Sequence, residues 1–191
     1  MNPISKFENW YKEELSRSKV EIPSACCLST IGLDGFPNAR FVSFKSLINN
    51  TFVFTGSVKS RKGLELKENP KAALTFWWTE TARQVRIQGT YSSLEKHLAD
   101  HYFSLRNKDS QLISLVFEQG KPFSSKSALH EIFNSKKKQY SHKEIPIPAD
   151  WGGFKIDPSR IEFLEFERSR LHLRELYSKK GDLWTSEILQ P

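Results

Sequence analysis

Three nitrogen-rich side chains lie close together near the C-terminal end of this chain, in the segment Arg170-Leu-His-Leu-Arg174. Because side chains of an extended strand alternate between two faces, Arg170, His172 and Arg174 are predicted to project together. Leu171 and Leu173 would then face the core. Two guanidinium groups and an imidazole favour an anionic or planar ligand, although the solvent-facing side of an ordinary strand would show the same pattern.

Two further cations begin and end a hydrophobic segment, Arg40-Phe-Val-Ser-Phe-Lys45. Arg40 and Lys45 have opposite parity, so a regular strand would direct them to different faces. Either a bulge within the strand or two distinct ligands would account for both cations.

The segment Ser60-Arg61-Lys62 falls in the first turns of a helix predicted over residues 57–68. Free N–H groups and the dipole at a helix N-terminus favour an anion, and two cations there oppose the dipole unless an anion is bound. Arginine can bind phosphate through two donors, while lysine adds a point charge. The segment therefore indicates a phosphate site, with a solvated helix end as the alternative.

A strand predicted over residues 82–91 carries Gln84, Arg86 and Gln88 on one face. A glutamine side chain offers both donors and acceptors, which suits the edge of a heterocycle with alternating C=O and N–H groups. A solvent-facing polar side of the strand is the alternative.

Tyr102, Arg106 and Ser110 are spaced four residues apart, so they lie on one side of a helix if it continues through all three. A phenol, a guanidinium and a hydroxyl can together form a cup for a second phosphate. The polar face of an amphipathic helix is the alternative.

The chain has 191 residues, which suits one domain with a full core, predicted over residues 1–191. Its formal net charge of +7 favours anionic partners. Nucleic acid is not predicted, because no motif for it is found and the basic residues are dispersed among strands. No metal site is predicted. Membrane association is not predicted either, since no apolar run reaches 18 residues and the N-terminus is charged rather than signal-like. Cys26 and Cys27 are adjacent, unlike a disulfide pair, which indicates a reducing cytoplasm.

The order of periodic segments predicts an α+β domain whose antiparallel sheet curls into a barrel. An N-terminal helix (1–18) precedes strands at 25–31, 38–47 and 51–55, the helix at 57–68, and strands at 72–78 and 82–91. A helical insert (92–140) is predicted to open with the capping-box pattern Ser92-x-x-Glu95 and to run through about Arg106 before two further helices. Strands at 151–156, 161–163 and 170–174 belong to a closing C-terminal block (151–188).

Taken in order, these motifs resemble those of the flavin-dependent pyridoxine/pyridoxamine 5′-phosphate oxidases from about residue 20 to the C-terminus. The motifs that carry the resemblance are Arg40…Lys45, Phe54-Thr55, Ser60-Arg61-Lys62, Arg83-Gln-Val-Arg-Ile87, Tyr102-Phe-x-x-Arg106-x-x-Asp109-Ser110-Gln111, Pro148-x-x-Trp151-Gly-Gly153, Ile161-Glu-Phe163 and Arg170-Leu-His172-x-Arg174. The resemblance implies a split β-barrel that binds FMN between the two subunits of a homodimer. It also implies oxidation of pyridoxamine or pyridoxine 5′-phosphate to pyridoxal 5′-phosphate, with O2 as acceptor.

The resemblance assigns the site residues to three groups. The FMN phosphate would be bound by Arg40 and by the segment Ser60-Arg61-Lys62. The rest of the flavin would be bound by Phe54, Thr55, Gln84, Gln119 and Arg174. The substrate phosphate would be bound by Lys45, Tyr102, Arg106 and Ser110. Arg170 and His172 would lie over the pyridine ring as the catalytic pair.

The chain departs from the family pattern near the flavin. Leu164 stands where tryptophan is usual, Leu173 replaces an acidic residue, Gly120 a common serine and Phe54 a tyrosine, and the usual Arg-Leu-Ala-Pro ending is Ile188-Leu-Gln-Pro191. Two alternatives within the same barrel are a related flavin oxidase acting on another ring, such as a phenazine precursor, and an FMN-binding protein without activity. The first would not need the Tyr102, Arg106 and Ser110 cup, whereas the second would tolerate Leu164 and Leu173 best.

Overall fold

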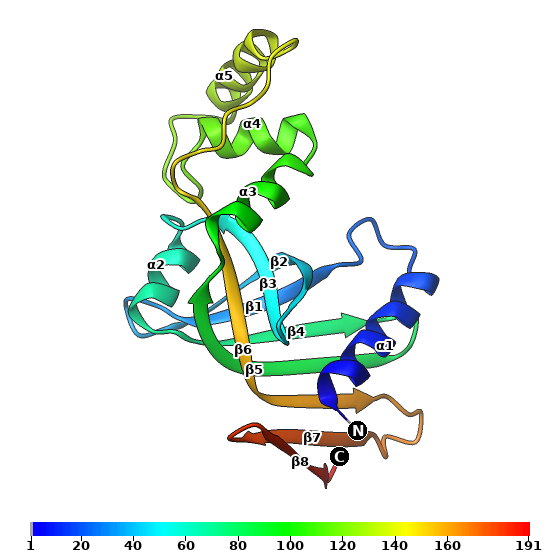
Figure 1. Ribbon diagram of the computed structural model, residues 1–191. Coiled ribbons are helices and arrows are strands. Elements are labelled where there is room, and N and C mark those ends of the chain that lie inside the picture. The colour runs from blue at the N-terminus through cyan, green and yellow to red at the C-terminus, as the bar shows by residue number, and fades with distance from the viewer. Residues whose placement is uncertain (1) are drawn as a thin grey trace.

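The computed structural model describes residues 2–191, and its strands form one antiparallel sheet that closes on itself (Figure 1). The elements are, in order, α1 (Pro3–Arg17), β1 (Ala25–Ile31), β2 (Pro37–Ile48), β3 (Thr51–Ser57), α2 (Arg61–Glu68), β4 (Lys71–Trp78), β5 (Arg83–Ser93), α3 (Lys96–Ser104), α4 (Lys108–Val116), α5 (Lys126–Gln139), β6 (Trp151–Glu165), β7 (Leu173–Lys180) and β8 (Leu183–Leu189).

The strands follow the order β3-β2-β1-β4-β5-β6-β7-β8, and a further pairing of β3 with β6 closes the first six into a barrel. The long strand β6 makes this closure possible. Its first half pairs with β3, as at Ile156 and Phe52, and its second half pairs with β7, as at Leu164 and Arg174. The predicted antiparallel barrel is therefore confirmed, and β7 and β8 extend its sheet beyond the closed part.

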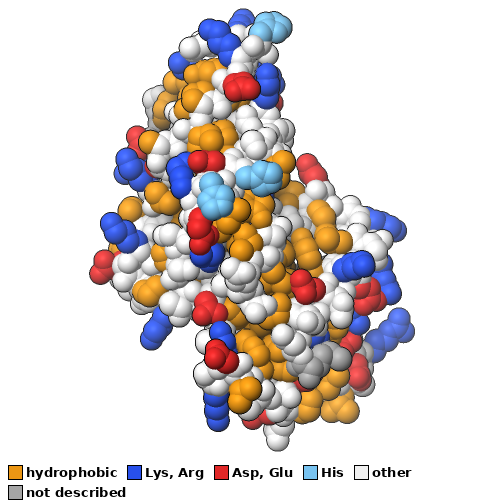
Figure 2. Space-filling model, in the orientation of Figure 1, with side chains coloured by type: hydrophobic (Ala, Val, Ile, Leu, Met, Phe, Trp, Pro, Cys, Tyr) orange, Lys and Arg blue, Asp and Glu red, His pale blue; other side chains and the backbone are white. Residues whose placement is uncertain are grey.

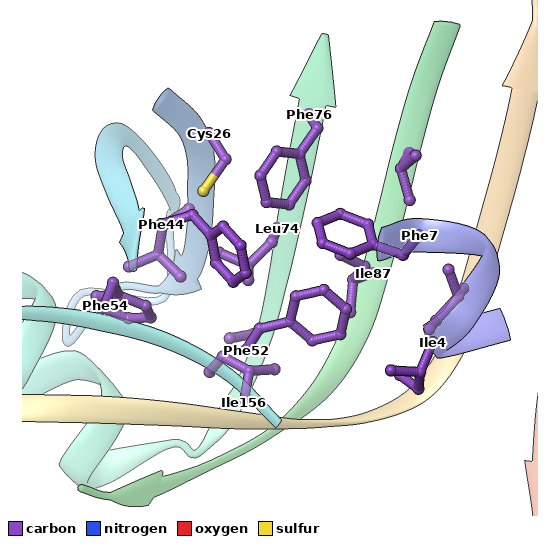
Figure 3. Packing of buried hydrophobic residues seen from close by; sticks show 14 of the residues in the cluster. Ile4, Phe7, Cys26, Phe44, Phe52, Phe54, Leu74, Phe76, Ile87 and Ile156 are labelled. Atoms are coloured by element: carbon purple, nitrogen blue, oxygen red, sulfur yellow. The ribbon is translucent and has the colours of Figure 1, made fainter. Parts of the chain in front are cut away.

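Phenylalanine side chains fill the barrel. Phe7 projects from α1 into the interior and packs against Phe44, Phe52 and Phe76, with ring centroids 5.6, 4.8 and 5.0 Å away (Figure 3). All four rings are buried, and burial of each such side chain stabilises the fold by roughly 1.5–3 kcal/mol. The amphipathic N-terminal helix thus supplies part of the core.

A second, smaller core attaches the helical insert to the barrel. Trp151, the first residue of β6, lies against Phe103 of α3 with ring centroids 5.2 Å apart, and its indole N–H donates to the carbonyl of Ala99 at 2.8 Å. The more distant helix α5 has no buried residue and projects away from the barrel (Figure 1). Among the helices of the described part, none is both long and apolar enough to cross a membrane.

The prediction of a strand over residues 170–174 is wrong for residues 170–172, since β7 begins only at Leu173. The strands predicted at 151–156 and 161–163 are one strand, β6, and residues 166–172 form the turn that leads from it to β7. Arg170 has a φ of 69°, in the left-handed region that no strand residue adopts, and its N–H donates to the carbonyl of Glu167. Leu171 and Leu173 were expected to face the core but are 69% and 43% exposed.

Two helix starts were also predicted wrongly. Ser92 belongs to β5 and pairs with Lys155 of β6, so it cannot cap a helix, and the carboxylate of Glu95 binds the Lys155 ammonium instead. The barrel ladder therefore extends β5 beyond the capping-box pattern, and α3 starts at Lys96. Similarly, β3 continues through Ser57, so α2 starts at Arg61.

Candidate functional site

Ser60, Arg61 and Lys62 lie at the N-terminal end of α2, as predicted. Ser60 is the N-cap residue, but its hydroxyl donates to the Ser57 carbonyl at 2.6 Å and makes no capping bond. The side chain thus leaves the first N–H groups of α2 without a cap, and such groups are suited to bind an anion.

Lys62 is a buried cation within this end of α2. Its ammonium donates to the Ser60 hydroxyl at 3.0 Å and to the Gln119 side-chain oxygen at 2.8 Å, and the side chain is 7% exposed. Gly56 leaves room for it, because a Cβ at that position would lie 3.3 Å from Lys62 Cε and Nζ. Burial, together with the positive charge of Arg40, lowers the pKa of Lys62 to about 8. An anionic ligand would reverse this destabilisation of the charged form.

Arg40 and Lys45 lie in different places, Arg40 beside α2 and Lys45 in the cavities described below. Two distinct ligands were one of the two explanations considered for their opposite parity. Arg40 donates to the Glu65 carboxylate at 2.7 Å, next to the start of α2. Lys45 lies at a shift in register between β2 and β3, so a bulge is present as well, and its ammonium contacts Ser43 at 3.3 Å. Burial and the nearby Arg106 lower the pKa of Lys45.

Two adjoining cavities collect most of the predicted phosphate-binding side chains. The first, of about 320 Å³, is lined by Lys45, Thr55, Lys62, Arg106 and Gln119 among others. The second, of about 480 Å³, is lined by Lys45, Tyr102, Leu105, Arg106, Asn107 and Ser110. Lys45 and Arg106 line both cavities, so the two cavities adjoin at these side chains.

The cup of Tyr102, Arg106 and Ser110 forms, but not on one continuous helix. Tyr102 belongs to α3, Arg106 to the turn after it, and Ser110 to α4, whose N-cap Asn107 accepts the Ser110 N–H at 2.8 Å. A sharp turn between two short helices therefore brings the three side chains to one cavity.

Bonds to neighbouring residues hold the two larger side chains of the cup. The Tyr102 hydroxyl shares a hydrogen bond of 2.6 Å with Ser46, and Arg106 donates to Ser114 at 2.7 Å. The Arg106 guanidinium also lies 4.6 Å from the centre of the Trp151 ring, and burial lowers its pKa. Sequence reasoning did not single out Ser46 or Ser114, because an isolated serine carries no signal of its own.

Phe54 is placed differently from the neighbouring Thr55. Its ring is buried in the barrel, where it stacks on Phe154 with centroids 4.8 Å apart. Because strand side chains alternate, Thr55 faces the first cavity while the Phe54 ring faces the core. Only the backbone of Phe54 can therefore contact a cofactor.

Four of the predicted residues lie away from both cavities, one on β5 and three at the end of the chain. Gln84, Leu164 and Arg174 lie side by side across β5, β6 and β7 in register, and Arg174 donates to Glu162 at 2.8 Å. None of Gln84, Arg170, His172 and Arg174 lines either cavity. In Figure 1, β7 lies at the opposite end of the molecule from α4 and α5. One copy of the chain does not bring the two groups together.

His172 is held by the turn in which it lies. Its Nδ1 accepts the N–H of Glu167 at 3.0 Å, which leaves Nε2 as the protonated nitrogen of the neutral ring. The ring meets Phe166 edge to face at 5.1 Å, and Phe166 in turn meets Trp77 at 4.8 Å.

Comparison with known proteins shows which family combines these features. Residues 13–134 match the family model described as "Pyridoxamine 5'-phosphate oxidase", and residues 151–191 match the one described as "Pyridoxine 5'-phosphate oxidase C-terminal dimerisation region". The chain belongs to the pyridoxamine 5′-phosphate oxidase family. The resemblance inferred from the motifs is thereby confirmed, and the chain is a member of a family of flavin oxidoreductases.

Curated relatives match this oxidase-family chain over its whole length. Proteins named pyridoxine/pyridoxamine 5′-phosphate oxidase from Cyanothece sp., Leptospira biflexa and Nostoc sp. are 38%, 36% and 40% identical to it. Each alignment covers 100% of this chain and 89% of the relative.

Two solved structures share the fold of this oxidase-family chain. PhzG from Burkholderia lata, in complex with tetrahydrophenazine-1-carboxylic acid, superposes with a TM-score of 0.90 at 28% identity, covering 99% of this chain and 92% of that one. A pyridoxamine 5′-phosphate oxidase-related, FMN-binding protein from Nostoc punctiforme has a TM-score of 0.79 at 18% identity, with 97% of each chain covered. The fold is therefore the FMN-binding split barrel.

The match to a dimerisation region bears on the two separate groups of residues. Arg170, His172 and Arg174 all lie within residues 151–191, the part that matches this region. Hydrophobic side chains remain exposed there, namely Leu171, Leu173, Leu183 and Ile188. Figure 2 shows hydrophobic side chains at the surface along the middle of the face and at its lower end. Such a surface supports a homodimer.

Proposed function

We propose that the protein is an FMN-dependent oxidase that converts pyridoxamine or pyridoxine 5′-phosphate to pyridoxal 5′-phosphate with O2 as acceptor. The observation that carries this proposal is the pair of adjoining cavities that share Lys45 and Arg106. One cavity reaches the buried cation Lys62 and the other contains Tyr102 and Ser110. Two sites for phosphate next to each other suit a phosphorylated cofactor bound beside a phosphorylated substrate.

FMN fits the residues at the start of α2. Lys62 is a buried ammonium with a lowered pKa, and in the described part of the chain no carboxylate forms a salt bridge with it. Arg61 and the uncapped N–H groups of α2 add further donors, and one phosphate would satisfy both. FMN is favoured over FAD because the chain shows no dinucleotide fingerprint. Thr55 and Gln119, in the same cavity as Lys62, would contact the rest of the flavin.

The remaining residues would act from a second subunit. Gln84 and Arg174 would contact the flavin, while Arg170 and His172 would lie over the substrate ring. Arg170 would orient the substrate and assist removal of the proton from its amine or alcohol, and His172 would position it by a hydrogen bond. The flavin supplies the hydride and oxygen chemistry, whereas the protein supplies position and electrostatics. Holding both phosphates keeps the two rings in register.

We place the protein in the cytoplasm, where its substrate class and reduced thiols are expected. Cys26 and Cys27 are both free, and burial raises the pKa of the Cys26 thiol to about 12. A thiol with such a pKa is a packing residue rather than a nucleophile.

The likeness to PhzG favours one second candidate, an oxidase acting on a phenazine precursor. A ring substrate without a phosphate would leave the cup of Lys45, Tyr102, Arg106 and Ser110 without a ligand. Desolvated cations with no anion are costly, so retention of the cup supports the phosphorylated substrate. Leu164 and Leu173 are the residues that would favour a third reading, FMN binding without turnover.

Anaerobic reduction of the bound flavin tests the proposal. The purified protein should be yellow, should release FMN on denaturation, and should lose its flavin absorbance on addition of pyridoxamine 5′-phosphate without O2. Pyridoxamine itself, which lacks the phosphate, is the matched control and should reduce the flavin far less at equal concentration. Flavin that pyridoxamine 5′-phosphate leaves oxidised would refute the assigned reaction, and reduction by tetrahydrophenazine-1-carboxylic acid alone would favour the second candidate.

A further inference from the structure

Glu65 is a buried carboxylate that no motif singled out. It lies one turn after Arg61 on α2, its side chain is 0% exposed, and its two oxygens accept four hydrogen bonds. Oε2 accepts from the Thr30 hydroxyl at 2.6 Å and from Arg40 Nη2 at 2.7 Å. Oε1 accepts from Asn38 Nδ2 at 2.6 Å and from Arg61 Nε at 2.8 Å.

A carboxylate this deeply buried is stabilised only if its partners are charged and well placed. Burial alone would raise the pKa of Glu65, but hydrogen bonds from Thr30, Arg61 and Arg40 more than offset it, so the pKa is lowered and the group stays ionised. Two of its four donors are arginines that come from different elements, β2 and α2. Glu65 therefore joins two cations that would otherwise repel each other.

The geometry leaves part of each arginine free. Arg61 uses Nε for Glu65 and Nη2 for the Asp34 carboxylate at 2.9 Å, so Nη1 keeps its donors. Arg40 uses Nη2 for Glu65 and Nη1 for the Thr30 hydroxyl, so its Nε–H remains. Fixing one edge of a guanidinium while another edge stays open is how a charged side chain is held ready for an anion.

We infer that Glu65 is a positioning residue for the phosphate of the cofactor, holding Arg40 and Arg61 in place before the ligand arrives. The inference rests on the proposed function, because it takes the ligand at the start of α2 to be FMN. Glu65 itself would not touch FMN. Its negative charge permits a second reading, in which it competes with the phosphate for the two arginines. The two readings predict opposite changes when the charge is removed.

Glu65→Gln separates the positioning role from competition. A glutamine presents an NH2 group where one oxygen stood, and that group would face an arginine donor, so either Arg40 or Arg61 loses its support. Loss of one charge-assisted contact is worth about 1.5–3 kcal/mol, so FMN should bind at least about tenfold more weakly. Riboflavin has the same ring without the phosphate, and its affinity should stay within about twofold of the wild-type value if only the phosphate contacts change.

The measurement is a titration of the full-length chain, freed of flavin, with FMN and separately with riboflavin, followed by flavin fluorescence. Glu14→Gln is the matched control, because Glu14 is a buried carboxylate of α1 that accepts from Thr81 N and Oγ1 at 3.1 and 2.8 Å, away from α2. It should leave the preference for FMN over riboflavin as in wild type. Asp34→Asn, which removes only the exposed partner of Arg61, should change FMN affinity little.

The other outcomes each overturn the inference. Tighter FMN binding by Glu65→Gln would show that Glu65 competes with the phosphate, and unchanged binding would show that it has no role. Equal weakening of FMN and riboflavin binding would show that Glu65 only stabilises the fold. A wild-type protein with no preference for FMN would instead refute the phosphate site, and the proposed function would fall with the inference. If Glu65→Gln is insoluble, Thr30→Val decides the question, since it removes the hydroxyl between Glu65 and Arg40 and should cost FMN affinity but not riboflavin affinity.

Discussion

Lys62 and Arg106 show how single residues are prepared for anions before any ligand binds. Both are partly or fully buried, both have a lowered pKa, and the polar contacts that hold them come from neutral groups, Ser60 and Gln119 for Lys62 and Ser114 for Arg106. A buried cation held only by neutral groups remains costly. A bound phosphate would offset this cost, so burial of the two cations lowers the stability of the free protein but strengthens the binding of an anion.

The pKa of Lys62 makes flavin affinity depend on pH. In the free protein this pKa is lowered to about 8, so the ammonium is charged below pH 8 and neutral above it. A bound phosphate stabilises the charged form and raises the pKa, so FMN affinity should begin to fall as the pH approaches 8 and should fall further above it. Titrations with FMN at several pH values up to 9.5 measure this. Lys62→Arg should flatten the profile, and a flat wild-type profile would show that Lys62 does not bind the phosphate.

Arg106 and Arg170 should fail differently when removed. In the proposed function Arg106 binds the substrate phosphate, so Arg106→Ala should remove binding felt equally in the ground and transition states and raise KM with little change in kcat. The lost contact is worth about 1.5–3 kcal/mol, or roughly 10- to 150-fold in affinity. Arg170→Ala should instead lower kcat more than it raises KM, because it acts where charge changes during oxidation.

Steady-state kinetics with pyridoxamine 5′-phosphate decide between these effects. Both variants should remain yellow, because neither arginine is assigned to the cofactor phosphate. Loss of flavin from Arg106→Ala, or normal turnover by Arg170→Ala, would contradict the assignment.

At the scale of elements, the alternation of apolar and polar residues predicted most strands well. It predicted poorly where the candidate site residues lie on them. The strand predicted at 25–31 is β1 with the same bounds, since its buried residues alternate with less buried ones. By contrast, Arg170 to Arg174 alternate like a strand, but only Leu173 and Arg174 belong to one, because the partner strand β6 ends at Glu165 and offers no ladder to residues 166–172. Local pattern cannot reveal where a partner strand ends.

The same limit applies to the helical insert and to α2. The spacing of Tyr102, Arg106 and Ser110 predicted their meeting, although a turn at 105–107 rather than one helix brings them together. Glu65 could have been found from its position four residues after Arg61, a spacing that favours an ion pair. Its bonds to Thr30 and Asn38 depend on the barrel and leave no trace in local sequence.

The N-terminal helix α1 should be essential to stability, because its Phe7 ring fills part of the barrel core. Phe7→Ala would leave a cavity among Phe44, Phe52 and Phe76 and should lower the free energy of unfolding by about 3–5 kcal/mol. Phe36→Ala, at a side chain that is 73% exposed, is the control and should cost little. Thermal or denaturant unfolding of both variants provides the comparison, and equal stability of the two would show that α1 does not complete the core.

At the scale of the whole molecule, we propose that the two groups of site residues meet only when two copies of the chain associate. Lys62, Arg106 and their neighbours line the cavities beside α2–α4, whereas Gln84, Arg170, His172 and Arg174 lie outside those cavities, on β5 and in the part that matches the dimerisation region. A homodimer would place the second group of one subunit against the first group of the other. The sequence implied this arrangement only through the family resemblance, because no local pattern shows which copy a side chain serves.

Complementation between two impaired variants tests the composite site most directly. Chains carrying Arg106→Ala and chains carrying Arg170→Ala would be co-expressed with different tags, and the mixed dimer purified by both. In that dimer one site carries both substitutions and the other carries neither, so we predict about half of the wild-type activity per dimer for the oxidation of pyridoxamine 5′-phosphate. Each parent homodimer should stay well below this level at substrate concentrations under the KM of Arg106→Ala. A mixed dimer no more active than its parents would contradict a site shared between subunits.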